Sequence, residues 1–264
     1  MDNAQPAPLP NADANADANA APLAGLLQRL LPEHAARFVV EPIAAEVGRD
    51  GFGRDVFEIE SVGDKLVLRG SSGVAPAGAL NWFLKYACQC HISWDSVQLN
   101  LPDPLPQVAP LRKVTPYRYR YYFNYCTFSY SLAFWDWERW EREIDWMALN
   151  GINAPLSVTG QEAVWRSVCR QMGLRDDEID AFLVGPAFLP FGWMGCIDGW
   201  GGPLPERWCD EQAELQQKIV ARQRALGMTP ILQGFTGHVP PALVHHFPQS
   251  KVHPLSSWAG FPPT

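Results

Sequence analysis

Side chains that follow candidate strands are the groups of this chain that could do chemistry. In parallel β/α folds, reactive groups lie just beyond the carboxyl ends of the strands. That rule selects Asn124, Cys126, Glu162 and the segments 191–194 and 236–238. An amide, a carboxylate and aromatic rings at one rim are suited to binding a small polar molecule such as a sugar.

Glu162 is the carboxylate whose position alone suits acid or base work. It follows Val158-Thr159-Gly160 and opens a predicted helix. The helix dipole also favours a glutamate in the first turn, and we prefer that structural interpretation.

Asn124 and Cys126 each have a functional and a structural interpretation. Asn124 can donate to and accept from a sugar hydroxyl, although asparagine also forms turns. Cys126 has no histidine or lysine beside it in sequence to activate the thiol, so we expect a packed thiol and not a nucleophile.

Trp193 and Trp258 lie in predicted loops. A loop tryptophan exposes apolar surface unless it covers a core or stacks on a ligand, and the C–H faces of sugar rings suit such stacking. Core cover is the commoner arrangement.

We expect no metal site. The run Cys88-Gln-Cys90-His91 has one residue between its cysteines, and the second ligand pair of a zinc site is missing. His245 and His246 are adjacent and point apart on a helix, so they do not form a shared site with His238.

The composition describes a globular chain. Of its 264 residues, 47% are hydrophobic and 19% are charged. A net charge of -7 disfavours a nucleic-acid partner, and there is no apolar run of eighteen residues that would span a membrane. No Lys or Arg precedes Arg29, so no secretory signal is visible, which leaves a cytoplasmic location or export by another route. The six cysteines are too sparse for a disulfide framework.

The chain divides into four predicted parts. Residues 1–22 repeat Asn-Ala-Asp-Ala and should form a disordered tail. Residues 23–100 predict a small α+β domain, with a helix over 23–38, strands at 38–40, 56–60 and 65–70, and a helix over 74–86. Five prolines mark residues 101–116 as a linker, and residues 117–264 predict part of a barrel.

The last part alternates strands and helices, which predicts parallel strands with crossover helices. Strands are expected at 119–125, 152–158 and 229–235, with 188–191 as a further candidate, and helices at 135–149, 161–172 and 206–226. A closed (β/α)8 barrel takes roughly 250 residues, so this segment predicts the first half of one. An open doubly wound sheet is the alternative, but the glycine turn of a nucleotide site is missing.

Four of the eleven tryptophans lie between Trp135 and Trp146. They indicate either an aromatic-lined sugar site or a heavily packed helix. The spacing is helical, and charges three and four residues apart, such as Asp136 with Arg139, predict a solvent-facing stripe.

Ordered motifs over about residues 70–260 resemble the α-N-acetylglucosaminidase family of glycoside hydrolases. The motifs are Asn-Tyr-Cys-Thr at 124–127, Phe-Trp-Asp-Trp at 134–137, the run at 140–153, Gly-Gln-Glu-Ala at 160–163 with Trp165, Gly-Pro-Ala-Phe-Leu at 185–189, Met-Gly at 194–195, Gly-Pro-Leu-Pro at 202–205, Gly-Met-Thr-Pro at 227–230, Gly-His-Val-Pro at 237–240 and Ser-Trp at 257–258.

The resemblance implies an N-terminal α/β domain, a (β/α)8 TIM barrel and a helical C-terminal domain. It implies retaining hydrolysis of terminal α-linked N-acetylglucosamine, with no metal or organic cofactor. A retaining mechanism needs two carboxyl groups roughly 5 to 5.5 Å apart. In the family both glutamates lie on later barrel strands, beyond the position that matches Thr264, so no catalytic residue is assigned in this chain.

The resemblance also implies a substrate-binding set made of Asn124, Cys126, Phe191, Met194 and Trp258. Relatives carry a tryptophan where this chain has Phe191. The tryptophans of segment 135–146 then become structural parts of the first barrel helix.

Three functions remain open. The chain is the N-terminal portion of an exo-glycosidase that acts on an N-acetylglucosamine-terminated glycan, inactive by itself until the second half of the barrel is supplied. Alternatively, it is a non-catalytic carbohydrate-binding remnant. In a third alternative, Glu162 and Asp198 act as an independent carboxylate pair.

Overall fold

The computed structural model describes residues 16–264, with side chains from residue 22 onward. The helices of the described part are α1 (Ala16–Leu30), α2 (Ala75–Trp82), α3 (Tyr125–Tyr130), α4 (Trp137–Leu149), α5 (Gln161–Gln171), α6 (Asp176–Phe182), α7 (Leu189–Trp193), α8 (Trp208–Ala225) and α9 (Leu243–His246). The strands are β1 (Phe38–Pro42), β2 (Glu46–Val47), β3 (Gly53–Arg54), β4 (Val56–Val62), β5 (Lys65–Gly70), β6 (His91–Ile92), β7 (Val97–Gln98), β8 (Leu111–Val114), β9 (Tyr121–Tyr122) and β10 (Ala154–Pro155).

Contacts divide the chain into two compact units. The first unit contains the described residues up to Tyr121, together with Arg142–Pro155 and Arg222–Thr229. The second contains Tyr122–Glu141, Leu156–Ala221 and Pro230–Thr264. Each unit is described separately.

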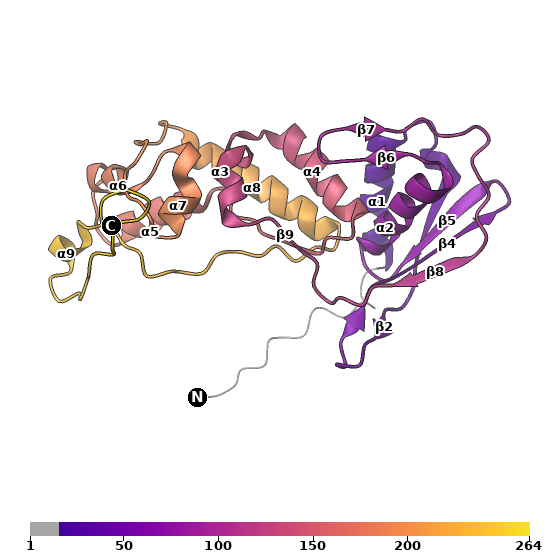
Figure 1. The fold of residues 1–264 in the computed structure, drawn as a ribbon, viewed down its shortest axis with the longest axis horizontal. Helices are drawn as coiled ribbons and strands as arrows, with labels where there is room; N and C mark the ends of the chain where they lie inside the picture. The colour runs from indigo at the N-terminus through magenta and orange to yellow at the C-terminus, as the bar shows by residue number, and fades with distance from the viewer. Residues whose placement is uncertain (1–15) are drawn as a thin grey trace. The chain divides into compact units, whose positions relative to one another are not determined.

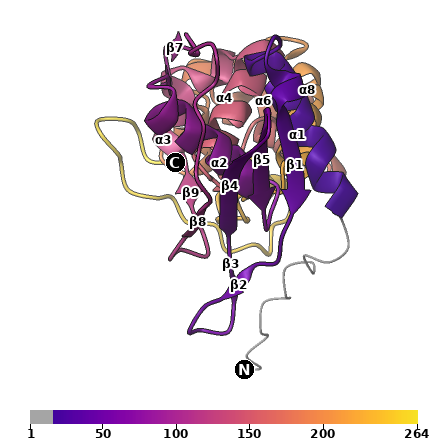
Figure 2. The same ribbon diagram turned by 90° about the vertical axis from the view of Figure 1, so that its right-hand side faces the viewer.

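A four-stranded sheet in the order β1-β5-β4-β8 is the centre of the first unit. Strand β1 is parallel to β5, whereas β4 is antiparallel to both β5 and β8. Helix α1 packs against β1, and α2 packs against β4 and β5 (Figure 1; Figure 2). Val56 and Ile59 of β4 are completely buried.

The predicted elements of this unit form with shifted boundaries. Helix α1 begins at Ala16, before the expected residue 23, and ends at Leu30. The predicted tail of residues 1–22 therefore lies mainly outside the described residues. Residues Leu111–Val114 of the predicted linker pair with β4 as the edge strand β8. These four residues can form this pairing because none of them is a proline, which would lack the N–H needed for the strand hydrogen bonds.

An ion pair joins α1 to α4 within the first unit. The Arg29 side chain donates to both carboxylate oxygens of the buried Asp145, at 2.8 and 2.6 Å. Trp94 Nε1 donates to the buried Glu143 at 3.0 Å. Glu143 and Asp145, two carboxylates of segment 135–146, are thus buried and each has a partner.

The second unit has short strand contacts surrounded by helices. The Leu156 N–H donates to the Tyr122 carbonyl, and the Ser157 N–H donates to the Ile231 carbonyl, both at 2.9 Å. Leu156 and Ile231 form a parallel bridge. The predicted strand at 188–191 is wrong, because Pro186 and Pro190 each lie in the first turn of a helical segment there.

Helices α4, α5 and α8 lie close to the predicted ranges. Asp136 accepts the Arg139 N–H at 2.9 Å, which starts α4 at Trp137 and not at residue 135. Gly160 turns the chain into α5 with a φ of +71°. Among the described residues, no helix combines the length and apolar character needed to cross a membrane.

Candidate functional site

The end of β9 sets the position of Asn124. Phe123 has a φ of +72°, a strained conformation for a side chain of this size, and the chain then turns directly into α3. Asn124 caps α3, because its Oδ1 accepts the Thr127 N–H at 3.1 Å. Its side chain is exposed, and the Nδ2 group makes no hydrogen bond to the part of the chain that the structure describes. Asn124 is therefore a helix cap with a donor left for a ligand.

Cys126 lies half-buried in the first turn of α3 as a free thiol. Burial raises the pKa of the nearby Cys196 thiol, and the charge of Cys126 raises it further. The two thiols thus lie close to one another. A packed thiol rather than a nucleophile stays the prediction for Cys126.

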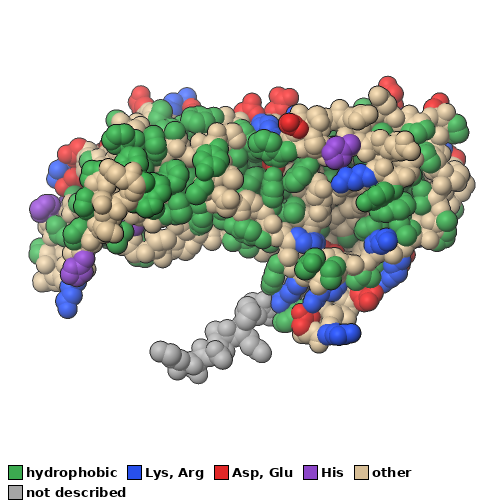
Figure 3. All heavy atoms as spheres, in the orientation of Figure 1, with side chains coloured by type: hydrophobic (Ala, Val, Ile, Leu, Met, Phe, Trp, Pro, Cys, Tyr) green, Lys and Arg blue, Asp and Glu red, His purple; other side chains and the backbone are tan. Residues whose placement is uncertain are grey.

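Helix α7, which carries Phe191, packs against α3, the helix that Asn124 caps and that contains Cys126. Phe191 of α7 and Trp258 are in ring contact, with centroids 5.2 Å apart and planes inclined by 31°. Trp258 is 40% exposed and Met194, just after α7, is 37% exposed. Figure 3 shows hydrophobic side chains gathered over α3 and α7. Three of the five predicted binding residues therefore present apolar surface to solvent or to a ligand.

The two tryptophans predicted to lie in loops differ. Trp193 is the last residue of α7, is 3% exposed and packs on Phe128 of α3, with ring centroids 5.1 Å apart. It therefore covers the core, whereas Trp258 is available to a ligand.

The segment 191–195 is held by hydrogen bonds to its carbonyl groups. Gln233 Nε2 donates to the Trp193 carbonyl at 3.0 Å, and Thr264 Oγ1 donates to the Gly195 carbonyl at 3.0 Å. These bonds fix the backbone between Phe191 and Met194, so their side chains have defined positions.

His238 adds a polar contact to the same segment. Its Nδ1 lies 3.1 Å from the Gly192 carbonyl oxygen, and its Nε2 lies 2.8 Å from Asp198 Oδ1. The ring also packs on Phe182, with centroids 4.9 Å apart. The sequence predicted that His238 lies at the carboxyl ends of the strands. It did not predict the contact with Asp198, because the two residues are forty positions apart in the chain and only the tertiary fold brings them together.

Glu162 is completely buried. Burial raises the pKa of its carboxyl to about 7, opposed by hydrogen bonds from its own backbone N–H and from Trp208. Trp208 Nε1 donates to Oε1 at 2.6 Å, while Oε2 has no partner among the described residues. A carboxyl closed off from solvent cannot reach a substrate proton, so Glu162 does not act at the aromatic surface. Glu162 contacts Trp208, whereas Asp198 contacts His238, so the two carboxyl groups do not share these partners.

The contacts of Trp135 and Trp140 in segment 135–146 indicate a structural role. Trp140 is buried and meets the rings of Trp135 and Phe123 edge to face, at 5.1 and 5.9 Å. Arg139 lies over the Trp135 ring at 3.9 Å. No group of three or more His, Cys, Asp or Glu side chains in the described chain is arranged to hold a metal ion.

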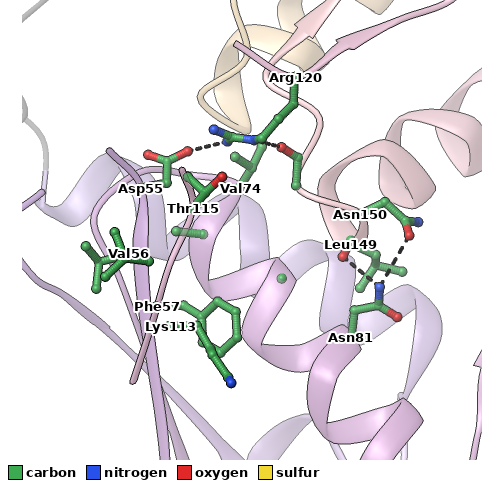
Figure 4. Close-up of a pocket in the computed structure, with 14 residues that line it drawn as sticks. Asp55, Val56, Phe57, Val74, Asn81, Lys113, Thr115, Arg120, Leu149 and Asn150 are labelled. Atoms are coloured by element: carbon green, nitrogen blue, oxygen red, sulfur yellow. Dashed lines mark hydrogen bonds and ion pairs between the residues drawn. The ribbon is translucent and has the colours of Figure 1, made fainter. Parts of the chain in front are cut away.

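A separate cavity of about 320 Å³ lies in the first unit (Figure 4). Arg120 forms an ion pair with Asp55 at one side, and Asn81 Nδ2 donates to the Leu149 carbonyl at 2.8 Å at the other. None of the five predicted binding residues lines it. The aromatic surface of the second unit is therefore the better candidate site.

Comparison with known proteins identifies the family. Residues 120–264 match the alpha-N-acetylglucosaminidase TIM-barrel domain, and residues 21–107 match the N-terminal domain of the same enzymes. The chain belongs to the alpha-N-acetylglucosaminidase family. Its fold is accordingly the N-terminal domain followed by part of the TIM-barrel domain, which confirms the predicted fold class and the resemblance.

The human alpha-N-acetylglucosaminidase is 48% identical to this chain over 245 residues, which is 92% of this chain and 33% of the human protein. A family 89 glycoside hydrolase from Clostridium perfringens, solved with 2-acetamido-1,2-dideoxynojirmycin, is 33% identical with a TM-score of 0.88. That match covers 94% of this chain and 28% of the hydrolase. The chain thus spans about a third of the length of these relatives.

A further structure of the Clostridium perfringens enzyme carries two glutamate-to-glutamine substitutions and holds its substrate, GlcNAc-alpha-1,4-galactose. It is 33% identical to this chain, with a TM-score of 0.87, and the match covers 93% of this chain and 28% of the enzyme.

Proposed function

We propose that this chain supplies the sugar-binding half of a retaining exo-α-N-acetylglucosaminidase that releases terminal α-linked N-acetylglucosamine. The contact between Phe191 and Trp258 carries this proposal, because it gives an exposed aromatic surface at α7, the helix that packs against the α3 helix capped by Asn124. Aromatic faces bind the C–H surface of a sugar, and an amide donor suits its hydroxyl or acetamido oxygen.

The five predicted residues have distinct roles in this proposal. Trp258 and Phe191 stack against the sugar ring, Met194 contacts its apolar edge, and Asn124 donates to an oxygen. Cys126 shapes the floor beside α3 without acting as a nucleophile. The binding set contains no carboxyl, imidazole or amine, so in this proposal it binds and orients the sugar and moves no proton.

The two carboxyl groups of the retaining reaction come from other segments in this proposal. Glu162 is enclosed by protein, and Asp198 is paired with His238. We propose that later barrel strands supply both groups, whether from further sequence or from a second chain. Neither a metal nor an organic cofactor takes part, and the partner is an N-acetylglucosamine-terminated glycan.

Calorimetric titration with N-acetylglucosamine tests the proposal. We expect millimolar or tighter binding by the chain and a loss of about tenfold or more in Trp258→Ala. The exposed Phe235 offers a control, and Phe235→Ala should bind as the wild type does. Absence of saturable binding by the folded wild type would exclude the proposed function.

A turnover assay distinguishes the proposed function from the alternative in which Glu162 and Asp198 act as an independent carboxylate pair. The chain should not hydrolyse an aryl α-N-acetylglucosaminide. Turnover that disappears in both Glu162→Gln and Asp198→Asn would instead support an independent carboxylate pair. Sugar binding without turnover even after addition of the remaining barrel would favour a carbohydrate-binding remnant.

A further inference from the structure

The cavity of the first unit is a second place where a small molecule fits. It has a volume of about 320 Å³, and none of the five proposed sugar-binding residues lines it. Ligand pockets usually measure about 300 to 1,000 Å³, so a cavity of this size suits a small ligand. Its walls come from β4, β8, α2 and the end of α4 (Figure 4).

The register of the sheet brings Phe57 and Lys113 to the same side of the cavity. These two residues are directly opposite each other in the antiparallel pair of β4 and β8. Side chains opposite each other in a sheet lie on one face. Phe57 is on the face that α2 covers, because a Cβ atom at Gly78 of α2 would lie 3.9 Å from its ring. Lys113 is therefore on that face too, and it stays exposed because β8 is the edge strand.

Gly78 leaves open space beside the Phe57 ring. It lies inside α2, where glycine is a poorer helix former than alanine. The Phe57 ring is the only described group outside α2 that a Cβ atom at Gly78 would meet within 4 Å. At Gly73, by contrast, a Cβ atom would lie 2.3 Å from the Leu226 carbonyl oxygen. Packing thus requires a glycine at Gly73 but not at Gly78, whose missing side chain keeps the cavity open.

The charged side chains around the cavity leave one positive charge unbalanced. Arg120 forms an ion pair with Asp55. The Arg120 guanidinium also donates to the Gly151 and Tyr117 carbonyl groups. Lys113 is the other charged side chain of the lining, and its ammonium has no hydrogen bond or ion pair within the described chain. A ligand with a single negative charge therefore balances the lining.

The remaining walls suit an apolar body. Val74 and Leu149 are buried, and the Phe57 ring is half-buried. Asn81 is only 7% exposed, and its Nδ2 donates to the Leu149 carbonyl at 2.8 Å (Figure 4). The Asn81 donor is thus already used by the protein, and Lys113 remains the group that attracts a charged ligand.

We propose that this cavity binds a small carboxylate with an apolar body, of the aryl or alkyl carboxylic acid class. The carboxylate pairs with the Lys113 ammonium at the open edge of the sheet, and the apolar body lies against Phe57 and Leu149 in the space beside Gly78. This site does not depend on the proposed sugar-binding function, because the two involve different residues.

Calorimetric titration of the purified chain with phenylacetate tests the site. The wild type should bind phenylacetate saturably, with a Kd of about 1 mM or lower. It should bind phenylacetamide, an uncharged ligand of similar shape, about tenfold more weakly. Lys113→Gln should lose about tenfold in phenylacetate affinity and bind the two ligands equally. The exposed Lys218 of α8 is the matched control, and Lys218→Gln should bind both ligands as the wild type does.

A cavity-filling variant locates the ligand. Gly78→Leu should abolish phenylacetate binding, and its urea midpoint should not fall, because leucine forms helices better than glycine. Saturating N-acetylglucosamine should not displace phenylacetate from the wild type.

Three results would overturn the carboxylate site and leave the sugar proposal untouched. They are no saturable phenylacetate binding, equal wild-type affinities for phenylacetate and phenylacetamide, and wild-type binding by folded Gly78→Leu. If Gly78→Leu does not fold, Lys113→Gln decides, and undiminished phenylacetate affinity in that variant would also overturn the site.

Discussion

His238 and Asp198 join two turns of the second unit, since His238 Nε2 lies 2.8 Å from Asp198 Oδ1. The other ring nitrogen, Nδ1, faces the Gly192 carbonyl oxygen at 3.1 Å. Both nitrogens therefore face oxygen acceptors, and a neutral imidazole can donate to only one of them. Because Gly192 lies between Phe191 and Met194, this histidine positions the proposed sugar-binding segment.

Loss of His238 should loosen that segment. In His238→Ala, amide exchange at Gly195 and Cys196 should rise about tenfold, because a buried hydrogen bond is lost. These two amides donate to the Gly192 and Phe191 carbonyl groups at 2.9 and 2.8 Å. Hydrogen exchange followed by NMR measures this without any ligand.

Conservative variants separate the two contacts of His238. The amide of asparagine can replace Nδ1, so His238→Asn should protect Gly195 better than His238→Gln does. The exposed His253 is the control, and His253→Ala should leave exchange unchanged. Equal exchange in wild type and His238→Ala would show that His238 does not hold the segment.

Asn124 combines a structural and a binding role that one substitution can separate. Asn124→Asp keeps the oxygen that accepts the Thr127 N–H, so thermal stability should change little. It removes the Nδ2 donor, so N-acetylglucosamine affinity should fall about tenfold. Asn124→Ala should lose both, with about 1 kcal/mol of stability. Undiminished sugar affinity in Asn124→Asp would exclude the amide as a sugar contact.

Gly160 combines a positive φ with a close approach to α8. A Cβ atom there would lie 2.9 Å from the Gln212 carbonyl oxygen. Gly160→Ala should therefore destabilise the fold by about 2 kcal/mol or more in urea unfolding. Gly51 has a similar φ of +77° with nothing within 4 Å, so Gly51→Ala should cost only about 1 kcal/mol. Similar losses in both variants would show that the close approach has no effect.

Glu162 should make stability depend on pH. Its carboxyl has a pKa of about 7 in the folded protein, against an ordinary value of 4.5. Between these values the folded state holds a proton that the unfolded state has lost. The free energy of unfolding should therefore fall as pH rises from 4.5 to 7, by roughly 3 kcal/mol at most.

Glu162→Gln should remove most of this slope and be relatively more stable above pH 7. Its amide keeps an acceptor for Trp208. The exposed Glu138 is the matched control, and Glu138→Gln should retain the wild-type slope. Urea unfolding at several pH values measures both, and identical slopes in Glu162→Gln and wild type would contradict the burial of a titrating carboxyl.

The sequence predicted the long helices well and the strands of the second unit poorly. Helices α4 and α5 are amphipathic, and the apolar face of such a helix must be buried. Strand β9 ends before its predicted limit because Asn124 caps α3 immediately afterwards. Such a cap competes locally with strand pairing, and a hydrophobic pattern does not reveal it.

Strand ends selected Asn124, Cys126 and segment 191–194 from the sequence, and the family resemblance joined them with Trp258 in one binding set. Exposure separates Trp258 from the buried Trp193, and exposure depends on tertiary packing. The contact of His238 with Asp198 and the enclosure of Glu162 also arise from segments far apart in the chain. These features required the fold.

Fluorine NMR of the chain labelled with 5-fluorotryptophan tests the central claim most directly. Trp258 is assigned by its loss in Trp258→Phe, and N-acetylglucosamine is then added. The account predicts a saturable shift of the Trp258 resonance, with the Trp94 resonance unchanged. A Trp258 resonance that stays fixed at saturating sugar would contradict a sugar site at Phe191 and Trp258.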